Sequence, residues 1–358
     1  MQRPAQTRPP EPERAAPVAA IAAGGLVIAV VVVAFLLLSG RSQPSAPSAP
    51  PSSTTPSVAG VGPTPLGSTG PGSSVVPGSS VAVASGSPPP APDRPIAYSK
   101  TAEATTIWSI QPGSAAVQLG KDGPSTGAAW SRDARQVAFI RRTGSGTGDV
   151  WLMAADGSSA HALTTGAQAI ERPSWSPNGD RIAFAASYGS ADTQLWVVPS
   201  AGGKPVQVTY VTGSPGAPSW SADGQSLIYA NTINGFAGLW IADPANPTSP
   251  TIGVFSTADG IVRSPMWSPN GSRIVFDGTL DGTSKIWLMN ADGSAPNPVT
   301  PPALAASWPA WSADGKQLVF QVTKGTDTDL YVMPVDGSAR PLDITPDSKH
   351  PAFDPAWW

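Results

Sequence analysis

The amino-acid sequence predicts an all-β protein built around a six-bladed β-propeller. Three observations lead to this prediction. A Trp-Ser-x-Asp or Trp-Ser-x-Asn motif recurs at intervals of 44 to 47 residues. Each copy continues into two short runs rich in Val, Ile, Leu and aromatic residues, which favour strands over helices. Asp-Gly and Asn-Gly pairs stand between the runs and are typical of tight turns with positive φ.

A membrane anchor is predicted near the N-terminus. Residues 1–17 are polar and contain three arginines, and residues 18–38, from Val18 to Leu38, carry no charge. As a helix, 18–38 would span roughly 30 Å, the thickness of the hydrocarbon core of a bilayer. A cleaved signal peptide usually has a shorter apolar core of about 7–15 residues. We therefore expect an uncleaved transmembrane helix, with 1–17 as a cytoplasmic tail because the arginines precede it.

A disordered Pro/Ser/Gly linker is predicted over residues 39–93, which contain 13 prolines. The segment has no apolar periodicity, and it has too little hydrophobic side chain to offset the entropy of ordering. As a flexible coil its ends would lie roughly 40 Å apart. The composition changes at Arg94, and residues 94–358 form the predicted propeller.

The predicted blades are ordered by aromatic residues at two positions of the repeat. One Trp ends the innermost strand, an apolar triplet ending in an aromatic forms the second strand, and another Trp marks the third. Such side chains are expected to pack between blades. The innermost-strand tryptophans are Trp130, Trp175, Trp220, Trp267 and Trp311, and the third-strand tryptophans are Trp108, Trp151, Trp196, Trp240 and Trp287.

The count of strands predicts how the ring closes. Second and third strands occur six times, whereas five innermost strands carry the Trp-Ser pair. Phe353, 42 residues after Trp311, is interpreted as a sixth, partial copy. The first unit begins at Arg94 without an innermost strand, so the C-terminal strand around Phe353 is expected to complete it. This pairing would remove the open edge of the sheet.

The repeats resemble the propeller repeats of the TolB family. The resemblance rests on the Trp-Ser-Pro-Asn-Gly core at 175–179, the Trp-Ser-Ala-Asp-Gly core at 311–315, the strand and turn at 285–293 and the ending at 350–355. It covers residues 94–358 and implies a propeller closed by its last strand. It also implies that the mouth of the channel receives a partner protein. TolB itself carries an α/β domain before its propeller, and this chain has the predicted membrane helix and linker in that place.

The composition excludes several classes of function. The chain has no Cys, which excludes disulfides, thiolate nucleophiles, iron–sulfur clusters and a lipidated cysteine anchor. It has two His, and Asp277, Asp281, Asp327 and Asp329 lack EF-hand spacing. A formal net charge of −3 provides no basic footprint for nucleic acid. We therefore expect no cofactor and no bound metal.

The sequence contains no catalytic motif that we can recognise. Neither a Gly-x-Ser-x-Gly nucleophile elbow nor a His-Glu-x-x-His zinc motif occurs. A serine follows each motif Trp, and its recurrence indicates a structural role in a turn rather than a unique nucleophile. The prediction is therefore a protein that binds and is not an enzyme.

The mouth of the axial channel is the predicted binding site. Innermost strands line the channel of a propeller, and in this chain the residues three and four positions before each core aromatic vary while the core does not. Repeat proteins carry specificity at such variable positions. The alternative is that these are ordinary solvated loop residues. The candidates are Glu171, Arg172, Arg263, Ser264, Ser307, Trp308, Lys349 and His350.

Together these patterns predict a single-pass protein of the cell membrane, with its N-terminus inside and a monomeric propeller outside. The channel mouth is expected to dock an envelope protein or polysaccharide. Two alternatives stay open, namely a hydrolase or lyase acting on envelope glycans and an extracytoplasmic sensor module. Convergence of Arg172, Arg263, Lys349, His350 and Glu171 on one position would favour the enzyme.

Overall fold

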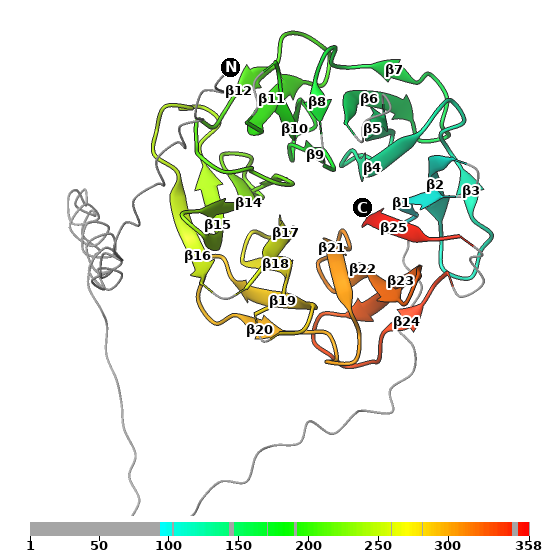
Figure 1. Ribbon diagram of the computed structural model, residues 1–358. Coiled ribbons are helices and arrows are strands. Elements are labelled where there is room, and N and C mark those ends of the chain that lie inside the picture. Colours follow the sequence, from blue (N-terminus) through cyan, green and yellow to red (C-terminus); the bar gives the residue numbers. More distant parts are fainter. Residues whose placement is uncertain are drawn as a thin grey trace, which may run out of the picture. The chain divides into compact units, whose positions relative to one another are not determined.

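The computed structural model describes residues 94–357, apart from 102–103, 143–146, 170, 190–191, 259, 281 and 346–349. The described residues form six blades around a central axis (Figure 1). Four blades are separate four-stranded sheets, and the other two are joined into one nine-stranded sheet through β8 (Gln168–Ala169), which pairs with a strand of each. The predicted transmembrane helix and linker, residues 18–38 and 39–93, lie outside this part of the chain. Within it, no helix is long and apolar enough to cross a membrane.

The first three blades follow one pattern of antiparallel strands, ordered from the axis outward (Figure 1). Blade 1 contains β25 (Ala352–Ala356), β1 (Ile96–Thr101), β2 (Thr105–Ile110) and β3 (Val117–Gln118). Blade 2 contains β4 (Ser125–Trp130), β5 (Gln136–Arg142), β6 (Gly148–Ala154) and β7 (His161–Ala162). Blade 3 contains β8 (Gln168–Ala169) and β9 (Ser174–Trp175) at the inner position, then β10 (Arg181–Ser187), β11 (Gln194–Pro199) and β12 (Val206–Gln207).

The other three blades repeat the pattern without interruption. Blade 4 contains β13 (Ser219–Trp220), β14 (Leu227–Ile233), β15 (Phe236–Ala242) and β16 (Ile252–Thr257). Blade 5 contains β17 (Val262–Trp267), β18 (Arg273–Gly278), β19 (Lys285–Asn290) and β20 (Asn297–Pro298). Blade 6 contains β21 (Ala306–Trp311), β22 (Gln317–Lys324), β23 (Asp327–Pro334) and β24 (Leu342–Asp343).

The C-terminal strand closes the ring, as the strand count predicted. β25 pairs antiparallel with β1, and Ala97 lies opposite Ala356. The Thr101 N–H extends the pairing by donating to the Pro351 carbonyl at 3.2 Å. Blade 1 is therefore assembled from both ends of the domain, and its hydrogen bonds hold the ring shut.

The sixth copy of the core aromatic is Trp357, and the assignment of Phe353 to this position was wrong by four residues. Phe353 lies opposite Ser99 within the closing strand, whereas Trp357 follows Ala356 at the strand's end and is buried. Trp357 lines the same axial cavity as the other five core tryptophans. It comes 46 residues after Trp311, which agrees with the spacing of the other copies.

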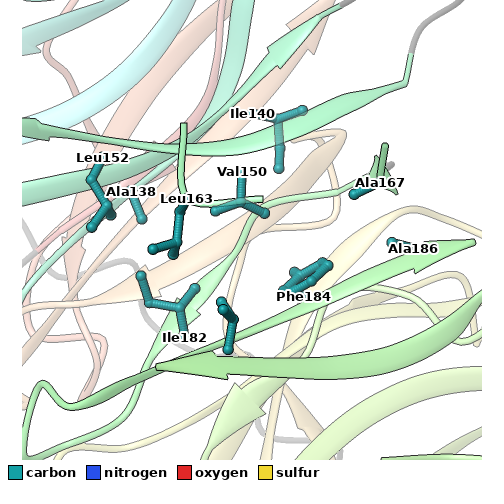
Figure 2. Close-up of a cluster of buried hydrophobic side chains, with 10 residues drawn as sticks. Ala138, Ile140, Val150, Leu152, Leu163, Ala167, Ile182, Phe184 and Ala186 are labelled. Carbon is teal, nitrogen blue, oxygen red and sulfur yellow. The ribbon is translucent and has the colours of Figure 1, made fainter. Parts of the chain in front are cut away.

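The second strand of each blade is apolar throughout because both of its faces are covered. In β5, Val137 and Phe139 pack toward blade 1, while Ala138 and Ile140 pack toward blade 3. Figure 2 shows the second of these clusters, in which Ile140 and its neighbours meet Phe184 of β10. Burial of aliphatic and aromatic area between blades is the main stabilising contribution.

The recurring serines form turns, as their repetition predicted. Ser131 Oγ donates to Asp133 Oδ1 at 2.7 Å and accepts from the Gln136 N–H at 3.0 Å. This arrangement ties the end of the innermost strand to the start of the second. The equivalent side-chain bonds are Ser221–Asp223, Ser268–Asn270 and Ser312–Asp314, whereas Ser176 donates to Asp180, four residues further on.

Core tryptophans link neighbouring blades through their indole N–H groups. Trp175 Nε1 donates to the carbonyl of Ala129 at 3.1 Å, and Trp220 Nε1 donates to the carbonyl of Ser174 at 3.1 Å. Trp311 Nε1 donates to the carbonyl of Met266 at 3.2 Å. In each case the acceptor precedes the core Trp of the preceding blade, so the repeat spacing itself builds the contact.

Candidate functional site

The innermost strands carry a bulge near the axis in four of the six blades. The residue three positions before the core Trp has a left-handed φ at Gly127 (64°), Ser264 (49°), Trp308 (54°) and Asp354 (53°). The pairing register shifts at the same places. A bulge redirects side chains, and non-glycine residues in this region of φ are strained. Arg172 and Ala217 occupy the equivalent positions of blades 3 and 4.

We call these six residues the mouth ring. Each lies three residues before a core Trp, on the side of the innermost strand where the chain enters the channel. The side chain at this position differs from blade to blade. It comprises Gly127, Arg172, Ala217, Ser264, Trp308 and Asp354.

Arg172 of the mouth ring reaches across the channel. It starts on blade 3, and its Nη1 donates to the Pro355 carbonyl on blade 1. Its guanidinium carbon lies 5.7 Å from the ring centroid of Trp308 on blade 6, which faces blade 3. The residue is only 6% exposed. The side chain therefore divides the channel into a charged mouth and a tryptophan-lined end.

Three carboxylates surround Arg172. Glu171 accepts a hydrogen bond from the Ala217 N–H. Asp277, which is 1% exposed on β18, accepts from the Trp308 N–H at 3.3 Å. Asp354 adds the largest favourable charge interaction of Arg172. Removal of a charge from water is costly unless a partner compensates it, so these groups depend on one another.

Two further arginines complete the cluster. Arg263 Nε lies 3.7 Å from Asp277 Oδ2, with 59% of its side chain exposed at the mouth. Arg142 Nε donates to Thr126 Oγ1 at 2.7 Å, and the charges of Asp354 and Glu171 act on it. Three arginines thus face three carboxylates, and the cluster is balanced when all six are ionised.

Burial controls the protonation of the cluster. It raises the pKa of Glu171, Asp277 and Asp354 above the ordinary values of carboxyl groups. Burial also lowers the pKa of Arg172, against the opposing effect of the nearby carboxylates. Ionisation of the cluster therefore carries a desolvation cost. A charged or polar group of a partner can offset this cost.

Most of the predicted site residues come together. Glu171, Arg172, Arg263 and Trp308 contact one another or share Asp277, and Ser264 and Ser307 lie on the bulges beside them. The remaining two do not join the cluster. His350 is exposed before the start of β25, and Lys349 lies outside the described residues.

Sequence reasoning considered Asp277 only as a metal ligand, and it missed Asp354 and Arg142. Asp277 follows a fully buried triplet on the second strand, and a charged residue directly after such a triplet was the available signal. Asp354 was missed as a site residue because the sixth repeat was aligned on Phe353. Alignment on Trp357 places Asp354 at the mouth ring. Arg142 likewise ends a buried second strand.

The other end of the channel forms an apolar cavity of about 180 Å³. All six core tryptophans line it, from Trp130 on blade 2 round to Trp357 on blade 1. Pro177, Pro269 and Arg132 also line it, as do Arg172 and Ala217 of the mouth ring.

These features define a closed six-bladed propeller of Trp-Ser repeats whose variable side chains meet on the axis. The described residues contain no group of His, Cys, Asp or Glu side chains that could hold a metal. The family model of the TolB beta propeller domain matches residues 87–253 and 246–349, so the chain belongs to this family. No curated protein sequence matches the chain.

Solved structures share the fold. TolB from Acinetobacter baumannii is 20% identical with a TM-score of 0.62, over 74% of this chain and 66% of that one. A putative TolB from Agrobacterium tumefaciens is 19% identical with a TM-score of 0.57, over 67% of this chain and 92% of that one. Hydrazine synthase from Kuenenia stuttgartiensis is 12% identical with a TM-score of 0.60, over 73% of this chain and 46% of that one. At these identities the likeness concerns the fold alone.

Proposed function

We propose that the protein is a non-catalytic binding protein whose channel mouth docks a partner protein. The observation that carries the proposal is the cluster around Arg172, in which six charged groups are held by contacts from all six blades. Its functional groups are engaged with one another, as expected of a preformed recognition surface rather than a reaction centre.

Exposed apolar side chains on the mouth face support a protein as the partner. Phe236 lies at the tip of the β14–β15 hairpin and is 53% exposed, and Tyr210 after β12 is 67% exposed. Ile261 precedes β17 at the same end of the propeller. Aromatic and arginine side chains are enriched among the anchors of protein interfaces. Arg263 supplies such an arginine two residues after Ile261.

The predicted membrane helix and linker complete the proposal. Residues 18–38 would anchor the chain in the cytoplasmic membrane with its N-terminus inside. Residues 39–93 would tether the propeller on the outer side within reach of envelope components. A tether of this kind raises local concentration without adding contacts to the interface. Specificity then resides in the mouth.

The test is capture of envelope components by full-length protein and by two exposed variants, Arg263→Glu and Phe236→Ser. The matched control is Arg273→Glu, because Arg273 is exposed on the same strand as Asp277 but at the opposite end. We expect both mouth variants to lose the partner that wild type and the control retain, as read by quantitative mass spectrometry. Equal capture by Arg263→Glu and wild type would show that the mouth is not the docking site.

An activity assay on the same protein distinguishes binding from the enzymatic alternative. Arg172, Arg263 and Glu171 do converge with Asp277, which is the arrangement that a hydrolase or lyase would use. Incubation with purified envelope glycan should release no soluble fragments. Fragment release by wild type that disappears in Asp277→Asn would replace the binding proposal with a catalytic one.

A further inference from the structure

We propose that the tryptophan-lined cavity binds the proline-rich segment of this same chain, Pro88-Pro89-Pro90-Ala91-Pro92, in an extended polyproline conformation. The segment lies outside the described residues, directly before the first strand of the propeller. The cavity extends from Arg172 and Ala217 of the mouth ring to the core tryptophans, and the docking proposed above involves the exposed residues on the mouth side of that ring, so the two proposals are tested separately.

The wall of the cavity has the chemistry that recognises polyproline helices. Six tryptophans and several prolines, among them Pro177 and Pro269, line it. Polyproline segments dock on aromatic-lined surfaces, and they lose little conformational entropy because their backbone is already extended. The volume of about 180 Å³ suits such a narrow chain.

The charges of the cavity wall also suit this segment. The charged residues that line the cavity are Arg132 and Arg172, and both are cations. The sixteen residues from 78 to 93 contain one charged side chain, that of Asp93, next to the prolines. A neutral segment flanked by an acid is therefore compatible with the wall.

The chain enters the propeller beside this cavity. Ala97 near the start of β1 lies opposite Ala356, and both Ala356 and Trp357 line the cavity. Neighbouring strands are about 4.8 Å apart, so the first described residues lie about one strand from its wall. Pro92 precedes Ala97 by five residues, which span up to about 17 Å when extended. The segment is therefore long enough to reach the axis.

Attachment at this point favours the segment of the same chain over other occupants. A short connection gives the segment an effective concentration in the millimolar range at the cavity. The same segment from a second copy would need a comparable protein concentration to compete. Any other extended chain would have to displace a ligand that is already present.

Disulfide trapping tests the inference, because the natural chain has no Cys. The trapping variant of the full-length protein carries Ala91→Cys with Ala222→Cys, since Ala222 lines the cavity. The matched control carries Ala91→Cys with Ala245→Cys. Ala245 is exposed at the same end of the propeller, just beyond the end of β15, and does not line this cavity.

Mild oxidation should form the bridge to position 222 within one chain at least tenfold faster than the bridge to position 245. A synthetic peptide of residues 78–93 should slow it, and so should replacement of the four prolines by Ser in the trapping variant. Equal rates at the two positions would overturn the inference. Bridges found only between two copies would overturn the assignment to the same chain. Mass spectrometry of the cross-linked peptides distinguishes these outcomes.

Discussion

Arg172 donates a hydrogen bond from Nη1 to the main-chain oxygen of Pro355, which lies 183 residues further along the chain. One residue belongs to blade 3 and the other to the strand that closes blade 1. The bond exists only when the ring is shut, because it crosses the axis. The residue that divides the channel therefore also depends on its closure, and folding of the ring and formation of the site are coupled.

Loss of the Arg172 charge should destabilise the propeller strongly. Arg172→Leu leaves Glu171 and Asp354 buried without their main counter-charge, which typically costs about 3–5 kcal/mol. Arg135→Leu is the control, because Arg135 pairs with Asp133 at the surface, where such pairs contribute about 0–1 kcal/mol. Urea unfolding followed by tryptophan fluorescence measures both. Equal losses in the two variants would contradict the assigned role.

The hydrogen bonds between blades can be isolated by comparing two core tryptophans. Trp220→Phe removes the bond to the Ser174 carbonyl, whereas Nε1 of the buried Trp130 has no partner among the described residues. Both substitutions remove similar aromatic area. We expect Trp220→Phe to cost about 1 kcal/mol more than Trp130→Phe in free energy of unfolding. If the Trp130 variant is equally or more destabilised, the bonds contribute nothing measurable.

Close packing at the bulge of blade 2 requires a glycine. A Cβ at Gly127 would lie 3.0 Å from Arg172 Cα, whereas a Cβ at Gly179 would meet nothing within 4 Å. Both residues have positive φ, so both alanine variants carry a backbone cost of about 1–2 kcal/mol. Gly127→Ala should lose roughly 1–3 kcal/mol more because of the clash. Thermal and urea unfolding of the two variants provide the comparison.

The buried carboxylates should make the propeller less stable as pH rises. Burial raises the pKa of Asp277 in the folded state, so the folded chain retains a proton that the unfolded chain has released. The resulting stabilisation is complete below about pH 4, near the unfolded pKa. It is lost as pH rises through the raised folded pKa. Asp277→Asn should therefore flatten the decline in unfolding free energy above pH 4.

The turn aspartates have the opposite effect and provide an internal check. Hydrogen bonds from the Ser131 hydroxyl and the Arg135 N–H lower the pKa of Asp133. Their stabilisation is present above about pH 4 and is lost as pH falls through the lowered folded pKa. Unfolding free energies measured by urea at half-unit pH intervals separate the two ranges. An unchanged slope in Asp277→Asn above pH 4 would show that this carboxyl does not titrate as inferred.

The fold could be predicted from the repeat because short sequence motifs specify each blade. The Trp-Ser turn, the apolar second strand and the Asp-Gly pair each form contacts within one blade or between adjacent blades. Arg172 and Trp308 were also predictable, since they vary at a constant position of the repeat. Asp277 was not, because it lies on a different strand and joins the site only when blades 5 and 6 pack together.

The amino-acid sequence was sufficient to establish the number of blades, the closure by the C-terminal strand and the structural role of the recurring serines and tryptophans. These features follow from short-range pattern and from the requirement that a sheet bury its apolar faces. The packing of the blades was needed to establish which charges meet on the axis and that Trp357 is the sixth core aromatic. Closure of the ring brings together residues that are far apart in the chain, and no local pattern records which of them will share a desolvated space.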